Sequence, residues 1–165
     1  METELQLREP VNLVSPRARL LWLIEGALQM LFLLVPQVIW WTFDRGGPAT
    51  PHLVVGAVWL VLAAVYLAVM PVWRYRVHRW ENTPTAVYTQ TGWLDQERRI
   101  APVSRIQTVD LVRGPVAQLL GLASVTVTTA SAAGPLRIHG LDLNVARHLV
   151  EELTALTVAE PGDAT

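Results

Sequence analysis

The residues of this chain that could take part in acid–base, nucleophilic or metal chemistry are few and widely spaced. The 165-residue sequence has no cysteine, and all thirteen basic residues are arginine. A thiolate nucleophile, a thiolate zinc site and a phosphate loop with its lysine are therefore excluded, and no Gly-x-Ser-x-Gly motif is present. Only His148 shares a helical face with carboxylates, at Glu151 or Glu152, and two ligands do not make a metal site. We expect no catalytic residue, no cofactor and no metal, because the four histidines are scattered: His52, His78, His139 and His148.

The most patterned stretch of the sequence is RIQTVDLVRGPVAQLLGLASVTVTTAS, residues 105–131. The alternating segments 106–112 and 124–129 predict strands, and residues 116–120 between them predict one short helical turn. Most of this stretch is expected to be fold framework, with core residues at Val109, Leu111, Val125 and Val127. Its polar side chains form a candidate interaction surface: Arg105, Gln107, Asp110, Arg113 and Gln118. The alternative, which we favour, is that Arg105 and Asp110 pair with each other or cap a turn.

Two apolar segments upstream predict a transmembrane hairpin. Residues 20–43 hold one charge and residues 53–72 hold none. Twenty helical residues rise about 30 Å, which is the thickness of a bilayer's hydrocarbon core. A chain this short could not bury two such helices in its own core. The intervening residues 44–52 contain two glycines and two prolines, which favour a turn, so the hairpin is predicted to occupy residues 20–73.

The distribution of arginine predicts the orientation of this hairpin. Three arginines precede the first segment and three follow the second, whereas the loop holds one, Arg45, beside Asp44. By the positive-inside rule, residues 1–19 form a cytoplasmic tail and both termini are cytoplasmic. The flanking arginines are Arg8, Arg17 and Arg19 on one side and Arg74, Arg76 and Arg79 on the other.

Arg74, Arg76 and Arg79, together with Trp73 and Trp80, are candidate membrane-surface residues. A basic residue near an anionic lipid surface contributes about 1 kcal/mol of attraction, so these residues would hold the following domain against the inner leaflet. The alternative, which we favour, is that the arginines only set the topology.

Four residues inside the apolar segments are candidates for helix packing. Glu25 and Gln29 share a helical face. A carboxylate in mid-membrane would mark an ion path, but Glu25 lies only about a turn and a half into its segment, near the interface. Ala64 and Ala68 form a small-xxx-small pair, which lets helices approach closely, either within the hairpin or against a partner.

The residues from Arg74 onward predict a separate cytoplasmic domain at 74–158, followed by a flexible tail at 159–165. The pattern changes to period two at Arg74 and predicts five or six antiparallel strands, at 74–78, 86–90, 93–100, 106–112, 124–129 and 136–139. A terminal amphipathic helix then covers the sheet, with an apolar stripe at Val145, Leu149, Leu153 and Leu156.

The order of these motifs resembles the bacterial pleckstrin-homology-like family, in the YdbS-like group whose domain follows a transmembrane pair. The resemblance covers the whole chain and rests on Arg105–Asp110, Gly114-Pro115, Leu120–Ala123 and Val127–Ala130. It implies an α+β membrane protein: a bent antiparallel β-sheet, or open barrel, closed by a C-terminal helix. One departure is Gln118, where many members carry arginine before the Leu-Leu-Gly turn.

The resemblance also implies a bacterial inner-membrane interaction module with no enzymatic activity. Our leading hypothesis is assembly with another membrane protein that carries PH-like domains, or with a second copy of the chain. The alternatives are a sensor of anionic lipid or of a small ligand, and a transporter subunit based on Glu25 and Gln29. The net charge of −1 gives no reason to expect nucleic acid.

Overall fold

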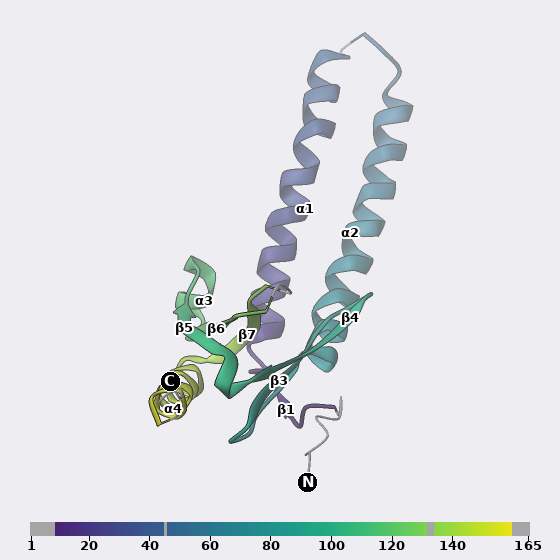
Figure 1. Cartoon of the computed structure of the whole chain (residues 1–165). Helices are drawn as coiled ribbons and strands as arrows, with labels where there is room; N and C mark the ends of the chain where they lie inside the picture. Colours follow the sequence, from purple (N-terminus) through teal and green to yellow (C-terminus); the bar gives the residue numbers. More distant parts are fainter. Residues whose placement is uncertain (1–8, 45, 132–133, 160–165) are drawn as a thin grey trace.

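A long helical hairpin projects from a small β-rich domain (Figure 1). The structure is a computed structural model and describes residues 9–44, 46–131 and 134–159. The hairpin consists of α1 (Ala18–Phe43) and α2 (Ala49–Val77), which pack against each other along their length. The glycines and Pro48 between them end the first helix and start the second, as the sequence predicts.

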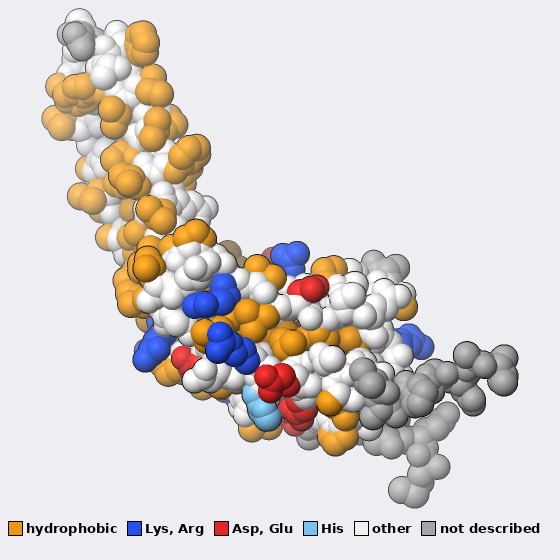
Figure 2. Space-filling model, turned by 90° about the vertical axis from the view of Figure 1, so that its left-hand side faces the viewer, with side chains coloured by type: hydrophobic (Ala, Val, Ile, Leu, Met, Phe, Trp, Pro, Cys, Tyr) orange, Lys and Arg blue, Asp and Glu red, His pale blue; other side chains and the backbone are white. Residues whose placement is uncertain are grey.

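The outward surface of the hairpin is apolar and uncovered. Both helices are long and apolar enough to cross a membrane, and in their most apolar windows only 22% of α1 and 11% of α2 is buried. Figure 2 shows hydrophobic side chains over the hairpin, whereas the charged side chains visible on this face lie on the domain. A core helix of a soluble protein would be mostly buried, so the exposed apolar surface of both helices is suited to a membrane, as the sequence predicts.

The second helix continues beyond its predicted end. Residues 74–78 were expected to form a strand, but α2 runs to Val77 and the first strand of the domain proper starts at Arg79. Arg74, Val77 and His78 fall at helical spacing and turn toward the protein, whereas Arg76 is exposed. Five alternating residues fit both periods, and continuing the helix keeps the backbone hydrogen bonds of its last turn.

The domain contains two antiparallel sheets. One has the order β1-β2-β3-β4 and the other β5-β6-β7. Their bounds are β1 Asn12–Leu13, β2 Arg79–Asn82, β3 Ala86–Gly92, β4 Gln96–Pro102, β5 Ile106–Val112, β6 Leu122–Thr129 and β7 Leu136–Asp142. A 3₁₀ turn, η1 (Val103–Arg105), carries the chain from the first sheet to the second. The seven strands in the described part exceed the five or six predicted.

The additional strand comes from the segment expected to be a free tail. Asn12 and Leu13 pair with Trp80 and Arg79, so β1 extends the first sheet at its edge. Two residues carry no detectable alternation, which is why the sequence did not reveal this strand. Arg8 and the rest of residues 1–8, Arg45, and residues 160–165 of the predicted tail lie outside the described residues.

The C-terminal helix α4 (Leu143–Ala159) covers the second sheet and η1, as expected. Its buried face is made by Ala146, Leu149 and Leu153, with Val150 half-buried. Val145 of the predicted stripe is instead 41% exposed. The spacing 146, 149, 150 and 153 is also helical, and the packing of α4 against β5 and β6 selects this face over the neighbouring one.

The base of α1 belongs to the core of the domain. Ala18, Leu21 and Trp22 are almost fully buried, in one cluster with residues of β6, β7 and α4. Gly140 of β7 has a left-handed φ of +73°, and a Cβ there would lie 2.7 Å from Cβ of Ala18. The hairpin and the domain therefore share one core at this point.

Candidate functional site

The five predicted membrane-surface residues are separated by the fold. We call the end of the hairpin that joins the domain its inner end, and the opposite end its outer end. Trp73 (52% exposed) and Arg76 lie on the exposed side of α2 near its inner end. Arg74 turns inward, with its guanidinium 4.7 Å from the centre of the Trp22 ring. Arg79 and Trp80 belong to β2, and Trp80 is half-buried beside β1 and the start of α4. These residues are separated because α2 ends at Val77 and the chain changes direction before Arg79.

The predicted interaction surface is also divided. Arg113 donates from Nε to the Leu122 carbonyl (3.1 Å) and from Nη2 to the Gln118 carbonyl (3.3 Å). Gln118 donates from Nε2 to the Arg113 carbonyl (3.2 Å). These bonds close the segment around α3 (Pro115–Leu119), so both side chains have a structural role here.

The other three residues of that surface are exposed. Arg105 lies in η1, Gln107 and Asp110 lie on β5, and Asp110 accepts a long hydrogen bond from Thr108 (3.4 Å). The expected pairing of Arg105 with Asp110 is wrong, since no ion pair joins them in the described structure. The two residues are five positions apart along an extended strand, which is about 16 Å.

The helix-packing candidates face away from the contact between α1 and α2. Glu25, Gln29, Ala64 and Ala68 are all exposed. The close approach is made by Gly26, where a Cβ would lie 3.2 Å from side-chain atoms of Tyr66, Leu67 and Met70, and by the buried Ala63. Small residues do form the contact, but not the pair that the spacing suggested.

A cavity of about 430 Å³ lies between the two sheets beside the inner end of α2. It is lined by residues from four places in the chain: Arg74 and His78 at the end of α2, Thr89, Thr91 and Gly92 of β3, Glu97 and Arg99 of β4, and Pro135, Arg137 and His139 at β7. We call this cavity the arginine pocket. It exists only because β3 and β4 face β7 across the gap between the sheets.

The three arginines of the pocket are held in different ways. Arg99 donates to Glu97 Oε1 (2.6 Å) and to the Pro135 carbonyl (3.1 Å), which fixes its position on the rim. Arg74 makes a cation–π contact with Trp22 and lies within electrostatic reach of Glu25. The guanidinium groups of Arg74 and Arg137 have no hydrogen bond or ion pair within the described residues. Two guanidinium groups at the pocket therefore have donors free for an external acceptor.

The two histidines of the pocket are neutral at pH 7. His78 donates from Nδ1 to the Arg74 carbonyl (2.8 Å), and its pKa is lowered to about 4 by burial and by the charge of Arg74. The pKa of His139 is also lowered, by burial and then by Arg74 and Arg137. With one carboxylate against three guanidinium groups, the pocket carries a net positive charge at neutral pH. An anion held there would favour the imidazolium forms.

A second, smaller cavity of about 260 Å³ lies on the other side of Arg74 and His139. It is bounded by Leu21, Trp22 and Glu25 of α1 and by the segment from Gly114 to Ala117. Glu25 thus faces the domain at the base of the hairpin, not the middle of the apolar region.

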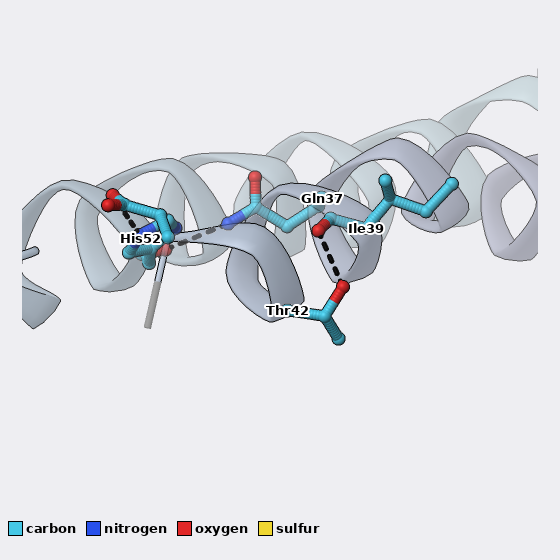
Figure 3. A network of polar contacts seen from close by, with 5 residues as sticks. Gln37, Ile39, Thr42 and His52 are labelled. Carbon is cyan, nitrogen blue, oxygen red and sulfur yellow. Dashed lines mark hydrogen bonds and ion pairs between the residues drawn. The ribbon is translucent and has the colours of Figure 1, made fainter. Parts of the chain in front are cut away.

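The outer end of the hairpin holds a different polar cluster (Figure 3). His52, only 4% exposed, donates from Nε2 to Asp44 Oδ2 (3.0 Å), and Gln37 donates from Nε2 to the His52 carbonyl (3.1 Å). The rings of Trp40 and Trp41 lie 4.0 and 5.0 Å from the His52 ring. This cluster ties the two helices together, and within the described residues the buried Nδ1 of His52 has no hydrogen-bonding partner.

The arrangement in the pocket suits binding of an anion and offers no set of metal ligands. Arginine presents planar pairs of N–H donors that match phosphate and carboxylate oxygens. Among the described residues there is no group of three or more histidine, aspartate and glutamate side chains close enough to hold a metal ion.

Comparison with known proteins agrees with this architecture. The model of the Bacterial PH domain family matches residues 20–157, which includes the hairpin. The chain belongs to this family. It is also 30% identical over 157 residues to the UPF0699 transmembrane protein YdbS of Bacillus subtilis (strain 168), covering 90% of this chain and 93% of the relative. No solved structure matches the chain.

Membership in the bacterial PH domain family confirms the predicted class: a membrane protein with a PH-like domain next to a helical hairpin. The family is not an established family of enzymes. The predicted strand–turn–strand signature at 105–130 corresponds to β5, α3 and β6, which form framework and not the pocket.

Sequence reasoning missed the residues of the arginine pocket other than Arg74. Arg99 and Arg137 lie on separate strands, 38 positions apart, and nothing local indicates that they line one cavity. His78 and His139 were considered only as metal ligands. The one available signal was Arg137 on β7, which alternates with the buried Leu136 and Ile138, and this pattern is common on exposed sheet faces.

Proposed function

We propose that the hairpin crosses the bacterial inner membrane twice, with the PH-like domain in the cytoplasm. Pairing of β1 with β2 places the segment before α1 on the same side as the domain, which supports an even number of crossings. Arg17, Arg19, Arg74 and Arg76 lie at the domain end of the hairpin.

Single cysteines test this topology, because the chain has none of its own. We expect an impermeant maleimide to label Ala49→Cys in intact cells and to label Thr3→Cys and Ala164→Cys only after lysis. Labelling of either terminal cysteine in intact cells would contradict the topology.

We propose that the protein is a non-enzymatic, membrane-anchored module whose arginine pocket binds the phosphate of an anionic ligand. The observation that carries the proposal is that the guanidinium groups of Arg74 and Arg137 lie at one cavity and have no hydrogen-bonding partner among the described residues. Charge-assisted bonds from guanidinium to phosphate are among the stronger protein hydrogen bonds. Because the pocket lies beside the inner end of α2, an anionic lipid headgroup is the nearest source of such a phosphate.

Arg137→Gln is the informative change, since Arg137 is exposed and bonds nothing that the fold needs. Its matched control is Arg147→Gln on the exposed face of α4. In nanodiscs of phosphatidylcholine, we expect added phosphatidylglycerol to raise the unfolding temperature of the wild type and of the control. Loss of one charge-assisted bond, worth about 1.5 kcal/mol or more, should weaken this binding about tenfold in Arg137→Gln.

The source of the phosphate is tested in the same assay. Stabilisation by soluble glycerol phosphate in phosphatidylcholine nanodiscs would indicate a soluble ligand instead of a headgroup. Equal responses of wild type and Arg137→Gln to both anions would refute the pocket as the site.

A second function is favoured by the outward position of Ala64 and Ala68. Both are exposed on the side of α2 away from the contact at Ala63, so a small-residue face is open within the membrane. We propose that it contacts a helix of another membrane protein carrying PH-like domains, or of a second copy of the chain. Mild-detergent purification should then recover that partner with wild type but not with Ala64→Leu/Ala68→Leu. The control is Val61→Leu, at an exposed position of the same helix. Recovery that is the same for all three would count against this face.

A further inference from the structure

Two parts of the domain reach up beside the hairpin and each presents one highly exposed leucine. The turn between β3 and β4 carries Leu94, which is 77% exposed. The short helix α3 carries Leu119, which is 87% exposed. Among the described residues of the domain these are the most exposed large apolar side chains, and neither the fold nor the arginine pocket accounts for them.

The first part lies beside α2, well above its inner end. Trp93, the residue before Leu94, makes an edge-on contact with the ring of Tyr66, with centroids 5.9 Å apart. Tyr66 lies 17 residues from the outer end of α2 at Ala49, a rise of about 26 Å. A hydrocarbon core of about 30 Å that starts at Ala49 therefore ends about 4 Å beyond Tyr66, so the turn that packs on Tyr66 lies at the inner boundary of the core.

The second part lies beside α1 at a matching level. The segment from Gly114 to Ala117 bounds a cavity together with Trp22 and Glu25. From Phe43 to Glu25, α1 rises about 27 Å, so Glu25 and the neighbouring α3 lie at the inner boundary of the hydrocarbon core. Figure 1 shows α3 beside α1 and the start of β4 beside α2, on opposite sides of the hairpin.

We propose that Leu94 and Leu119 insert into the lipid leaflet on the domain's side and dock the domain on the membrane at two points that flank the hairpin. The occupant is lipid, because both leucines lie at the level where the apolar surface of the hairpin is already in contact with the bilayer. Figure 2 shows that the apolar surface of the hairpin continues onto the adjoining edge of the domain.

The insertion is shallow. Non-helical backbone exposed to lipid does not occur within the hydrocarbon core, and Asp95 follows Leu94 directly with its side chain exposed. The backbone of both parts therefore stays among the headgroups, and only the leucine side chains reach the first methylene groups. Insertion at two points would fix the tilt of the domain and thereby the direction in which the arginine pocket opens.

The test uses the full chain, which has no cysteine of its own, reconstituted in phosphatidylcholine nanodiscs. Leu94→Cys and Leu119→Cys are each labelled with an environment-sensitive fluorophore, and a lipid with a quencher high on its acyl chain is added. The matched control is Val145→Cys, 41% exposed on α4, and the positive reference is Leu28→Cys, 56% exposed on α1. All four sites are exposed, so the substitutions leave the core intact.

We expect quenching at positions 94 and 119 to be several-fold stronger than at 145 and to approach that at 28. Quenching at 94 or at 119 no stronger than at 145 would overturn docking at two points. Because the lipid is zwitterionic, this result does not depend on whether the arginine pocket binds an anionic headgroup.

Discussion

The two ends of the hairpin hold their polar groups in opposite ways. At the outer end, His52, Asp44 and Gln37 bond to one another and the tryptophan rings enclose the imidazole. At the inner end, the guanidinium groups of Arg74 and Arg137 face a cavity and have no hydrogen-bonding partner in the part of the chain that the structure describes, beside two histidines whose pKa values burial lowers. Both ends are rich in tryptophan, histidine and charge, so composition alone does not distinguish them.

The difference shows how a structural polar cluster can be told from a binding site. Groups that satisfy each other add stability and leave little capacity for a ligand. Cations that remain unpaired at a cavity repel one another and lower the pKa values of neighbouring histidines, which is a cost that an incoming anion removes. We therefore propose the inner end as the binding site and regard the outer end as a clasp between the helices.

The largest expected effect tests the packing at the inner end of the hairpin. Trp22, 1% exposed, joins α1 to the core of the domain, so Trp22→Ala should lower the free energy of unfolding by about 3–5 kcal/mol. Trp73→Ala, at a 52% exposed position, is the control and should cost less than about 1 kcal/mol. Thermal and denaturant unfolding in detergent measure both. Similar losses in the two variants would contradict a core shared by hairpin and domain.

Acid should weaken the inner end. The pKa of His78 in the folded protein, about 4, is below its ordinary value of 6.5, so folding favours the neutral imidazole. The contribution to stability is present above pH 6.5, decreases as the pH falls toward 4, and amounts to about 3 kcal/mol at most. His139 changes in the same direction.

Unfolding measured between pH 7 and pH 4 tests this expectation, with His78→Asn as the comparison. Asparagine keeps a donor near the position of Nδ1 and does not titrate, so the decrease should be smaller in this variant. An identical decrease would show that His78 does not respond to pH as its burial requires.

Gly140→Ala tests the closest approach between α1 and the domain. The added methyl group would meet Cβ of Ala18 at 2.7 Å, and the left-handed φ disfavours any side chain. We expect a loss of about 2–3 kcal/mol in the free energy of unfolding. Gly114→Ala is the control, since a Cβ there meets nothing within 4 Å and the backbone is extended. An equally stable Gly140→Ala protein would mean that the two elements can separate.

The smallest effect is expected at the outer end. Asp44→Ala removes the acceptor of the His52 bond, which should cost about 0.5–1.5 kcal/mol, because the aspartate side chain is 40% exposed. Amide hydrogen exchange should increase in the outer turns of α1 and α2 and stay unchanged in the domain. Thr42→Val, which removes only an exposed bond to the Ile39 carbonyl, is the control. Faster exchange throughout the domain would contradict a local clasp.

Much of the fold follows from local patterns. The apolar segments predicted α1 and α2, and the valine–threonine alternation predicted β6 with Val125 and Val127 buried, as the structure has them. The strand β5 and the single turn of α3 were also predicted at nearly their observed bounds. These elements depend on hydrophobic period and turn residues, which act over a few positions.

Errors occurred where two periods fit the same residues. Residues 74–78 satisfy both alternation and helical spacing, and the tertiary contacts of Arg74 and His78 decided for helix. Val145 and Ala146 begin two overlapping helical stripes, and packing on β5 and β6 chose the second.

By itself the sequence determined the class of the protein: two long apolar helices, followed by a small β-rich domain that a C-terminal helix covers. The apolar length and the period of side chains decide this, because they fix which surfaces must leave water. Only the tertiary structure decided where chemistry can occur. Arg74, Arg99 and Arg137 line one cavity because β3 and β4 of one sheet face β7 of the other. This long-range contact cannot be recognised in the local sequence of any of the three segments.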